Sequence, residues 1–186
     1  MFVTSLCTSQ TTHSLLEDGI GLEANAYYKD TFNELDKFTG TWKYQSGSTV
    51  LEIIIQKRNM VFDSYFNNYT DMLIGEYRFV NPNGVQIINT LSALQIALEP
   101  FENNIAGAQI MDINMPASER RIKLKFSDPD RKYLKRYIIV KHHASQGNTP
   151  ETIEIEFTGE TSIVPDDNSP TELRVPEQNY TLTKVQ

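Results

Sequence analysis

Two stretches of strict alternation constrain the fold of this chain more than any other feature of its sequence. In "RIKLKF" (121–126) and "TIEIEF" (152–157), every second residue is large and apolar, and the residues between are polar or charged. A period of two places all the apolar side chains on one face of a β-strand. Both stretches are therefore predicted to be strands with one face in a core and the other in water.

The chain from Thr39 onward repeats this character. It is rich in Thr, Val, Ile, Tyr and Phe, and turn residues interrupt it every 8 to 12 residues or so, which is typical of all-β proteins. Gly47 and the pair Asn83-Gly84 are expected at the turns of two hairpins. We predict an all-β, antiparallel up-and-down meander, closed as a barrel of about 8 to 10 strands or packed as a sandwich.

Length and charge limit what such a fold does. A chain of 186 residues fits one domain, which we place at residues 31–186. The net charge is −7, and basic residues are not clustered, so nucleic acid is not an expected partner. No apolar run approaches the roughly 18 residues of a transmembrane helix, so no transmembrane segment is expected.

The N-terminus begins with a short apolar stretch that turns abruptly into Ser, Thr and Gln. We interpret residues 1–9 as the remnant of an export signal that lacks its basic front; an ordinary frayed terminus is the alternative. Leu6 precedes Cys7, the only cysteine, and does not suit a lipid anchor. Without Cys7 the chain has no thiol for disulfides or zinc. The expected location is periplasmic, outer-membrane-associated or secreted.

Two further segments precede the first predicted strand. Residues 10–30 mix glycines with scattered polar residues and are expected to form a loosely docked arm. A short helix is predicted over residues 31–38, because Thr31 can cap its start and Glu34 can reach back in a capping box. The apolar face of this helix would consist of Phe32, Leu35 and Phe38.

The only tryptophan, Trp42, stands two residues after Gly40 at the start of the first predicted strand. A short helix leading into Gly-x-Trp resembles the entry to the lipocalin or wider calycin barrels. The resemblance implies that the glycine lets the chain approach closely and that the indole plugs one barrel end beneath a basic side chain, for which Lys184 is the positional candidate. An ammonium over an indole is worth about 0.5 to 2 kcal/mol. Arginine is the usual partner and stacks better than lysine.

A second resemblance covers nearly the whole chain. The segments "LDKFTGTWKYQSGSTVLEI", "IGEYRF", "GVQIINTL" and "VPEQNYTLTKV" resemble an uncharacterised family of small exported proteins from Gram-negative bacteria. That family has no established activity, so the resemblance implies export and domain boundaries but no catalytic residue.

The sequence contains few residues in patterns typical of catalytic, metal-binding or cofactor-binding sites. His142 and His143 are adjacent, so on a strand they point to opposite faces and cannot share a metal. The acidic turns "SDPDRK" and "VPDDNSP" lack the ligand spacing of a calcium loop. No nucleophile or phosphate-loop motif occurs. We therefore predict a protein that is not an enzyme, with no cofactor and no metal site.

Two binding functions remain. The first is a lipocalin-like protein that takes a small, partly apolar ligand in its barrel mouth. The second is a cell-envelope or secreted interaction module with a filled core, which recognises a protein or glycan through its loops. Large inward residues count against a roomy cavity, so a packed interior would favour the second. The candidate ligand contacts are Tyr44, Tyr77, Phe79, Phe101, Met115 and Tyr137.

One segment breaks the regular spacing of turns. Residues 98–120 are too long for a hairpin loop. Phe101 and Met115 within this segment are expected to contact a ligand at the barrel mouth, since methionine fits irregular shapes; alternatively, they plug the core or pack on the helix predicted over residues 31–38.

Overall fold

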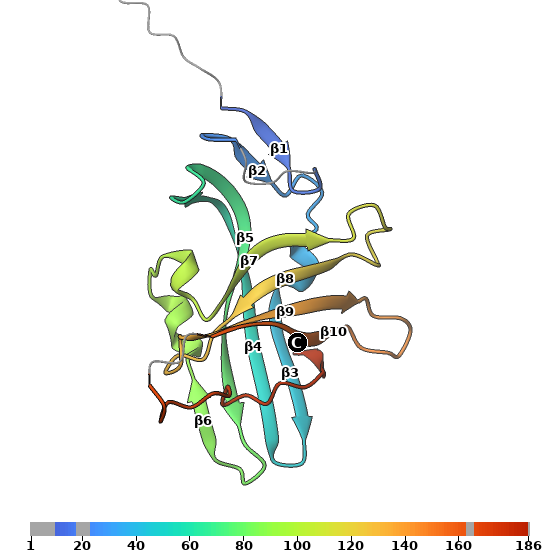
Figure 1. The fold of residues 1–186 in the computed structure, drawn as a ribbon. Helices are drawn as coiled ribbons and strands as arrows, with labels where there is room; N and C mark the ends of the chain where they lie inside the picture. The colour runs from blue at the N-terminus through green and yellow to red at the C-terminus, as the bar shows by residue number, and fades with distance from the viewer. Residues whose placement is uncertain (1–9, 18–22, 163–165, 186) are drawn as a thin grey trace, which may run out of the picture.

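The computed structural model describes residues 10–17, 23–162 and 166–185. These residues form one large β-sheet with three short 3₁₀ helices, η1 (Asp36–Phe38), η2 (Leu91–Gln95) and η3 (Pro100–Glu102) (Figure 1). The strands are β1 (Thr12–Ser14), β2 (Tyr27–Lys29), β3 (Gly40–Ser46), β4 (Thr49–Asp63), β5 (Asn68–Val80), β6 (Gln86–Asn89), β7 (Ile105–Met111), β8 (Arg121–Phe126), β9 (Leu134–His143), β10 (Thr152–Ser162) and β11 (Tyr180–Val185).

Eight of these strands close into an antiparallel barrel. Their order is β3-β4-β5-β7-β8-β9-β10-β11, and β11 pairs with β3 to complete the ring. The short strands β6 and β2 both add to β5 outside the ring, and β1 pairs with β2. Closure leaves no unpaired edge within the ring. The predicted up-and-down barrel is confirmed, the sandwich is excluded, and the architecture is consistent with a lipocalin-like barrel.

The alternating apolar residues fill the barrel. In β8, Ile122, Leu124 and Phe126 are buried, whereas the basic residues between them are partly exposed. Inward side chains from all eight strands expose 2 % or less of their surface, among them Ile53, Leu73, Tyr77, Ile138, Ile153 and Leu182. Side chains that lined a ligand-sized hollow would be accessible from it, so among the described residues the interior is packed like an ordinary core where these side chains lie, whereas Tyr44 of β3 and Phe157 of β10 are only partly buried.

Strand β5 is buried on both of its faces. Leu73, Tyr77 and Phe79 belong to the interior, and Met72 and Ile74 form a second apolar cluster with Ala106 of β7. Leu94 of η2 packs on that second cluster. The connection between β5 and β7 therefore covers the outer face of the barrel at this point.

Trp42 is completely buried, and its Nε1–H donates to the carbonyl of Phe38 at 2.9 Å. Lys184 pairs with Trp42 across β11 and β3, and its Nζ lies 5.0 Å from the centre of the indole. Gly40 has a φ of +127°, and a Cβ there would approach the Lys184 side chain to 3.0 Å. The backbone angle favours glycine, and a Cβ would in addition crowd the end of the Lys184 side chain.

A strap, residues 170–177 of the β10–β11 connection (red in Figure 1), packs into the core through Leu173 and Val175. Between them, Arg174 binds the fully buried Asp128, with Nε 3.0 Å from Oδ2 and Nη2 2.5 Å from Oδ1. Burial alone would raise the pKa of Asp128, but hydrogen bonds from Arg174 and from the Asp130 N–H lower it below its usual value. The strap therefore occupies space that an open mouth would need.

The arm of residues 10–30 is not loosely attached, contrary to the expectation from its composition. Leu15, Ala26 and Tyr28 are buried in the main core. Strand β2 pairs in parallel with β5, and β1 pairs in parallel with β2. Local composition missed this because the pairing partner of the arm lies about forty residues away in β5.

The helix predicted over residues 31–38 is also wrong, apart from the single 3₁₀ turn η1. Asn33 has a φ of +55°, which an α-helix does not accommodate. Asp30, not Thr31, caps the segment, because its carboxylate accepts the N–H groups of Glu34 and Leu35 at 2.8 and 3.0 Å. Glu34 is instead paired with Lys37 and Arg120. Leu35 and Phe38 are buried as expected, but Phe32 is exposed.

No helix in the described part of the chain is long and apolar enough to cross a membrane.

Candidate functional site

The six predicted ligand contacts do not form one site. Tyr77 and Phe79 are core residues, and the Tyr77 hydroxyl donates to the carbonyl of Ser127 at 2.9 Å. Tyr44 packs against Tyr180 with their ring centres 5.1 Å apart. Tyr77 and Phe79 thus belong to the buried interior and Tyr44 is partly buried against it; in a sequence, inward aromatic residues suit a filled core and a lined cavity equally well.

The other three, Phe101, Met115 and Tyr137, are exposed, so the idea that Phe101 and Met115 plug the core is wrong. Met115 lies in the loop between β7 and β8. Phe101 borders two hollows, and Tyr137 borders one of them. Both hollows lie on the outside of the barrel: most side chains around the first are exposed, and β8 and β9 line the second with Lys125, Lys135 and Tyr137, which alternate with buried inward residues.

The first hollow has a volume of about 800 Å³ and lies between the β4–β5 hairpin and η3. Its walls carry large apolar side chains that are about half exposed or more. We call these residues the aromatic surface: Met60 (47 % exposed), Phe62 (48 %), Tyr65 (87 %), Phe66 (45 %) and Phe101 (50 %). Contiguous exposed apolar surface of this kind marks interaction sites in soluble proteins.

The turn of the β4–β5 hairpin holds its aromatic side chains in place. Asp63 Oδ1 accepts the N–H groups of Tyr65 and Phe66, at 2.9 and 3.2 Å. The two rings pack edge to face with their centres 4.9 Å apart. Phe62 contacts Tyr69 on the neighbouring strand at 5.2 Å between ring centres. The aromatic surface therefore rests on local hydrogen bonds and ring contacts.

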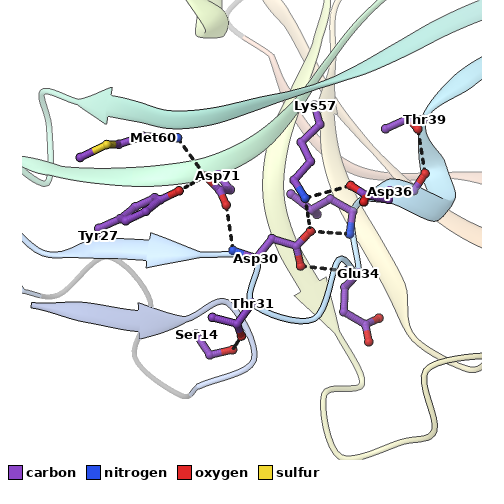
Figure 2. Close-up of polar contacts among 11 residues, drawn as sticks. Ser14, Tyr27, Asp30, Thr31, Glu34, Asp36, Thr39, Lys57, Met60 and Asp71 are labelled. Carbon is purple, nitrogen blue, oxygen red and sulfur yellow. Dashed lines mark hydrogen bonds and ion pairs between the residues drawn. The ribbon is translucent and has the colours of Figure 1, made fainter.

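A bulge in β4 turns Met60 outward. The register shifts between Arg58 and Val61, so Asn59 and Met60 together oppose Asp71 of β5. Met60 has a φ of +54°, and its N–H donates to Asp71 Oδ1 at 2.9 Å (Figure 2). The buried carboxylate thus replaces the strand partner that the bulge removes.

The same carboxylate joins the bulge to the N-terminal arm. Asp71 also accepts the Tyr27 hydroxyl at 2.6 Å and the Asp30 N–H at 2.9 Å. Asp30 in turn binds Lys57 Nζ at 2.7 Å, and Figure 2 shows these contacts converging between β2, β4 and β5. Burial, and then the hydrogen bond to Asp71, raise the pKa of Tyr27 above its usual range, so the phenol stays a donor. The arm is therefore a support for the aromatic surface.

The second hollow, which we call the basic cleft, has a volume of about 430 Å³. It is lined by Phe101, Glu102, Asn104, Lys125, Ser127, Lys132, Lys135, Arg136 and Tyr137. Lys125 Nζ donates to the carbonyl of Phe101 at 2.6 Å and so ties β8 to η3. Burial, followed by the nearby charge of Lys132, lowers the pKa of Lys125.

The histidines lie away from both hollows. On β9, His142 Nε2 is 2.8 Å from Glu151, and His143 Nε2 is 3.3 Å from Glu154. Within the described ranges, no group of three or more His, Cys, Asp or Glu side chains is placed to hold a metal ion.

Sequence reasoning missed most of the aromatic surface, although one signal was available. The β4–β5 turn reads "DSYFNN", which puts Tyr65 and Phe66 where small polar residues usually stand. Aromatic residues at a hairpin tip have no core to enter, and that placement points to a surface role. The bulge at Met60 could not be anticipated, because it depends on Asp71 across the sheet.

Comparison with known proteins places the chain by family alone. Neither the curated proteins nor the solved structures contain a significant match to it. A family model, described as "Family of unknown function (DUF6705)", matches residues 1–185. The matched region includes the barrel, the strap and both hollows. Because the match spans nearly the whole chain, the chain belongs to this family of unknown function, DUF6705.

Proposed function

We propose that this protein is a non-catalytic interaction module that binds a protein partner through the aromatic surface. The single observation that carries the proposal is the group of half-exposed apolar side chains on the β4–β5 hairpin and η3, led by Tyr65 at 87 % exposure. A barrel fold is compatible with a binding protein. The packed interior favours recognition on the outside over a ligand held within the barrel.

The chemistry of the surface favours a protein as the partner. Protein interfaces are enriched in aromatic residues, methionine and arginine. The first hollow has these types: four aromatic side chains, Met60 and Arg58. Its acidic groups are few, and Asp63 is engaged by the backbone of the turn.

The support beneath the surface favours tight binding. Asp63 fixes the hairpin tip, and Asp71 fixes the bulge and the arm. A surface that is already ordered loses less conformational entropy when it binds, so more of the contact energy remains as affinity. This arrangement suits a few central aromatic anchors surrounded by weaker contacts.

Binding is testable with a photo-crosslinking residue at position 65 in the full-length protein, expressed in its own cells. We expect one protein to be crosslinked from position 65 and not from position 32, where Phe32 is also well exposed (67 %) but lies outside the hollow. With the purified partner, Tyr65→Ser with Phe66→Ser should weaken affinity by about thirtyfold or more, as loss of two anchors at about 1 to 2 kcal/mol each implies. The matched control Phe32→Ser should leave it unchanged.

Thermal unfolding separates lost binding from lost folding, because both tip residues are exposed and their replacement should shift stability by no more than about 0.5 kcal/mol. Equal crosslinking from positions 65 and 32, or unchanged affinity in the double variant, would refute the protein-binding role. Recovery of a glycan at position 65 would refute the choice of partner.

Export belongs to the same proposal. Residues 1–9, interpreted as a signal remnant, lie outside the described residues. We expect the protein expressed in its own cells to be found in the envelope or the medium. Its N-terminus should then be Gln10, because the signal is removed by cleavage before that residue. Fractionation with N-terminal sequencing checks this, and a cytoplasmic protein that retains residues 1–9 would contradict it.

A further inference from the structure

We propose that the basic cleft is a binding site for a small organic anion with a flat apolar body; the cleft adjoins the aromatic surface at Phe101, and its role does not depend on protein binding there. The cleft brings three lysines, Lys125, Lys132 and Lys135, together with the exposed rings of Phe101 and Tyr137. Its volume of about 430 Å³ falls within the range of small-molecule sites, which are about 300 to 1,000 Å³.

The charges in the cleft are not balanced within it. Arg136 is paired with Glu177, with its Nε 2.9 Å from the carboxylate. The three lysines share their walls with a single carboxylate, Glu102. This concentration of positive charge occurs in a chain whose net charge is −7. An anion in the cleft would supply the missing negative charge.

Lys125 carries the clearest sign of this imbalance. Its ammonium is partly withdrawn from water and donates to the neutral carbonyl of Phe101. Burial, and then the charge of Lys132, lower its pKa, while the charge of Glu76 opposes them. A bound anion would counter both effects, because it replaces lost hydration and screens the repulsion between the ammonium groups. Ligand and charged Lys125 would therefore stabilise each other.

The apolar part of the site is held in place. Lys123 Nζ lies 4.5 Å from the ring centre of Tyr137. On the adjacent strand, Gly159 sits at a bulge with a φ of +69°, and a Cβ there would come within 3.1 Å of the Tyr137 ring. A larger residue at 159 would push the ring aside. Tyr137 is thus positioned before any ligand arrives, which lowers the entropic cost of binding.

The test uses the purified full chain and calorimetric titration with 2-naphthoate and 2-naphthyl phosphate, two anions on the same flat ring. We expect saturable binding of one or both anions. The anion that binds more tightly shows whether the cleft prefers a carboxylate or a phosphate. The neutral 2-naphthylmethanol should bind at least about tenfold more weakly, equivalent to about 1.4 kcal/mol. Raising the salt concentration should weaken the binding of the anions and leave the binding of the alcohol unchanged.

Charge-neutral variants assign the binding to this cleft. The double variant Lys132→Gln with Lys135→Gln should lower the affinity for the anions by about tenfold or more. The matched control Lys29→Gln removes one exposed lysine from β2, outside the cleft, and should change the affinity by less than about twofold. Lys125→Met should weaken binding further, and if that variant unfolds, the double variant still decides the question.

A second readout does not depend on any variant. The pKa of Lys125, followed by NMR of its labelled side chain, should rise when the anion is added. The proposal is overturned by any of three results: no saturable binding, equal binding of the neutral alcohol, or affinity that Lys132→Gln with Lys135→Gln leaves unchanged. Since these variants leave Tyr65 and Phe66 untouched, failure here is distinguishable from failure of the protein-binding role.

Discussion

Replacing Trp42 by alanine will lower the free energy of unfolding by about 3 to 5 kcal/mol, because it empties the largest side chain from a fully buried site. The indole packs beneath Lys184 and beside His142 and receives no solvent contact. Strands β3 and β11 close the barrel at this point, so the cavity would lie at the closing seam. Urea unfolding followed by circular dichroism measures the change.

Trp42→Phe provides the graded control. Phenylalanine retains much of the apolar contact but leaves the Phe38 carbonyl without the 2.9 Å hydrogen bond from the indole. An unsatisfied buried acceptor costs about 1 to 3 kcal/mol, so this variant should fall between the wild type and Trp42→Ala. A loss below about 1 kcal/mol in Trp42→Ala would show that Trp42 does not support the closed barrel.

Replacing Arg174 by methionine will cost a similar amount, about 3 to 5 kcal/mol, since it leaves the carboxylate of Asp128 buried without its charged partner. The loss should appear as release of the strap, because Leu173 and Val175 enter the core on either side of Arg174. Proteolysis within residues 170–177 would report that release. The double variant Asp128→Asn with Arg174→Met should recover part of the stability, because it removes the stranded charge.

The same pair predicts how stability changes with pH. The pKa of Asp128 is lowered in the folded state, so its contribution is fully present above the unfolded value of about 3.9 and is lost as the pH falls through the folded pKa. We expect wild-type stability to decline below about pH 4, and Arg174→Met to lose part of that decline. Identical pH profiles for the two proteins would contradict the assignment.

The strands were predictable because their signal is local. Alternation in "RIKLKF" and "TIEIEF" matches the burial that the structure shows, with Ile122, Leu124 and Phe126 inside and the lysines between them partly exposed. The hairpin turns at Gly47 and Asn83-Gly84 were equally visible. Each of these features depends on residues within about ten positions of one another.

The segments before β3 were predicted poorly because their partners are distant. Thr31 and Glu34 match a capping box, but Asp30 takes the capping role, and its carboxylate is fixed by Lys57 of β4. Leu15 and Tyr28 look unremarkable in the sequence, yet they enter the core once β2 pairs with β5. Tertiary contacts overrode local propensity in both cases.

The sequence by itself determined that the chain is a β-protein in which strands such as β8 and β10 have one apolar face, because the period of two is a property of neighbouring residues. Only the tertiary structure decided where the candidate sites lie. Phe101 and Tyr137 both border the basic cleft, where Lys125 of β8 ties η3 to the sheet, and Met60 turns outward because Asp71 accepts its N–H across the sheet. Such sites depend on contacts between separate strands and helices, which bring together residues that no local pattern connects.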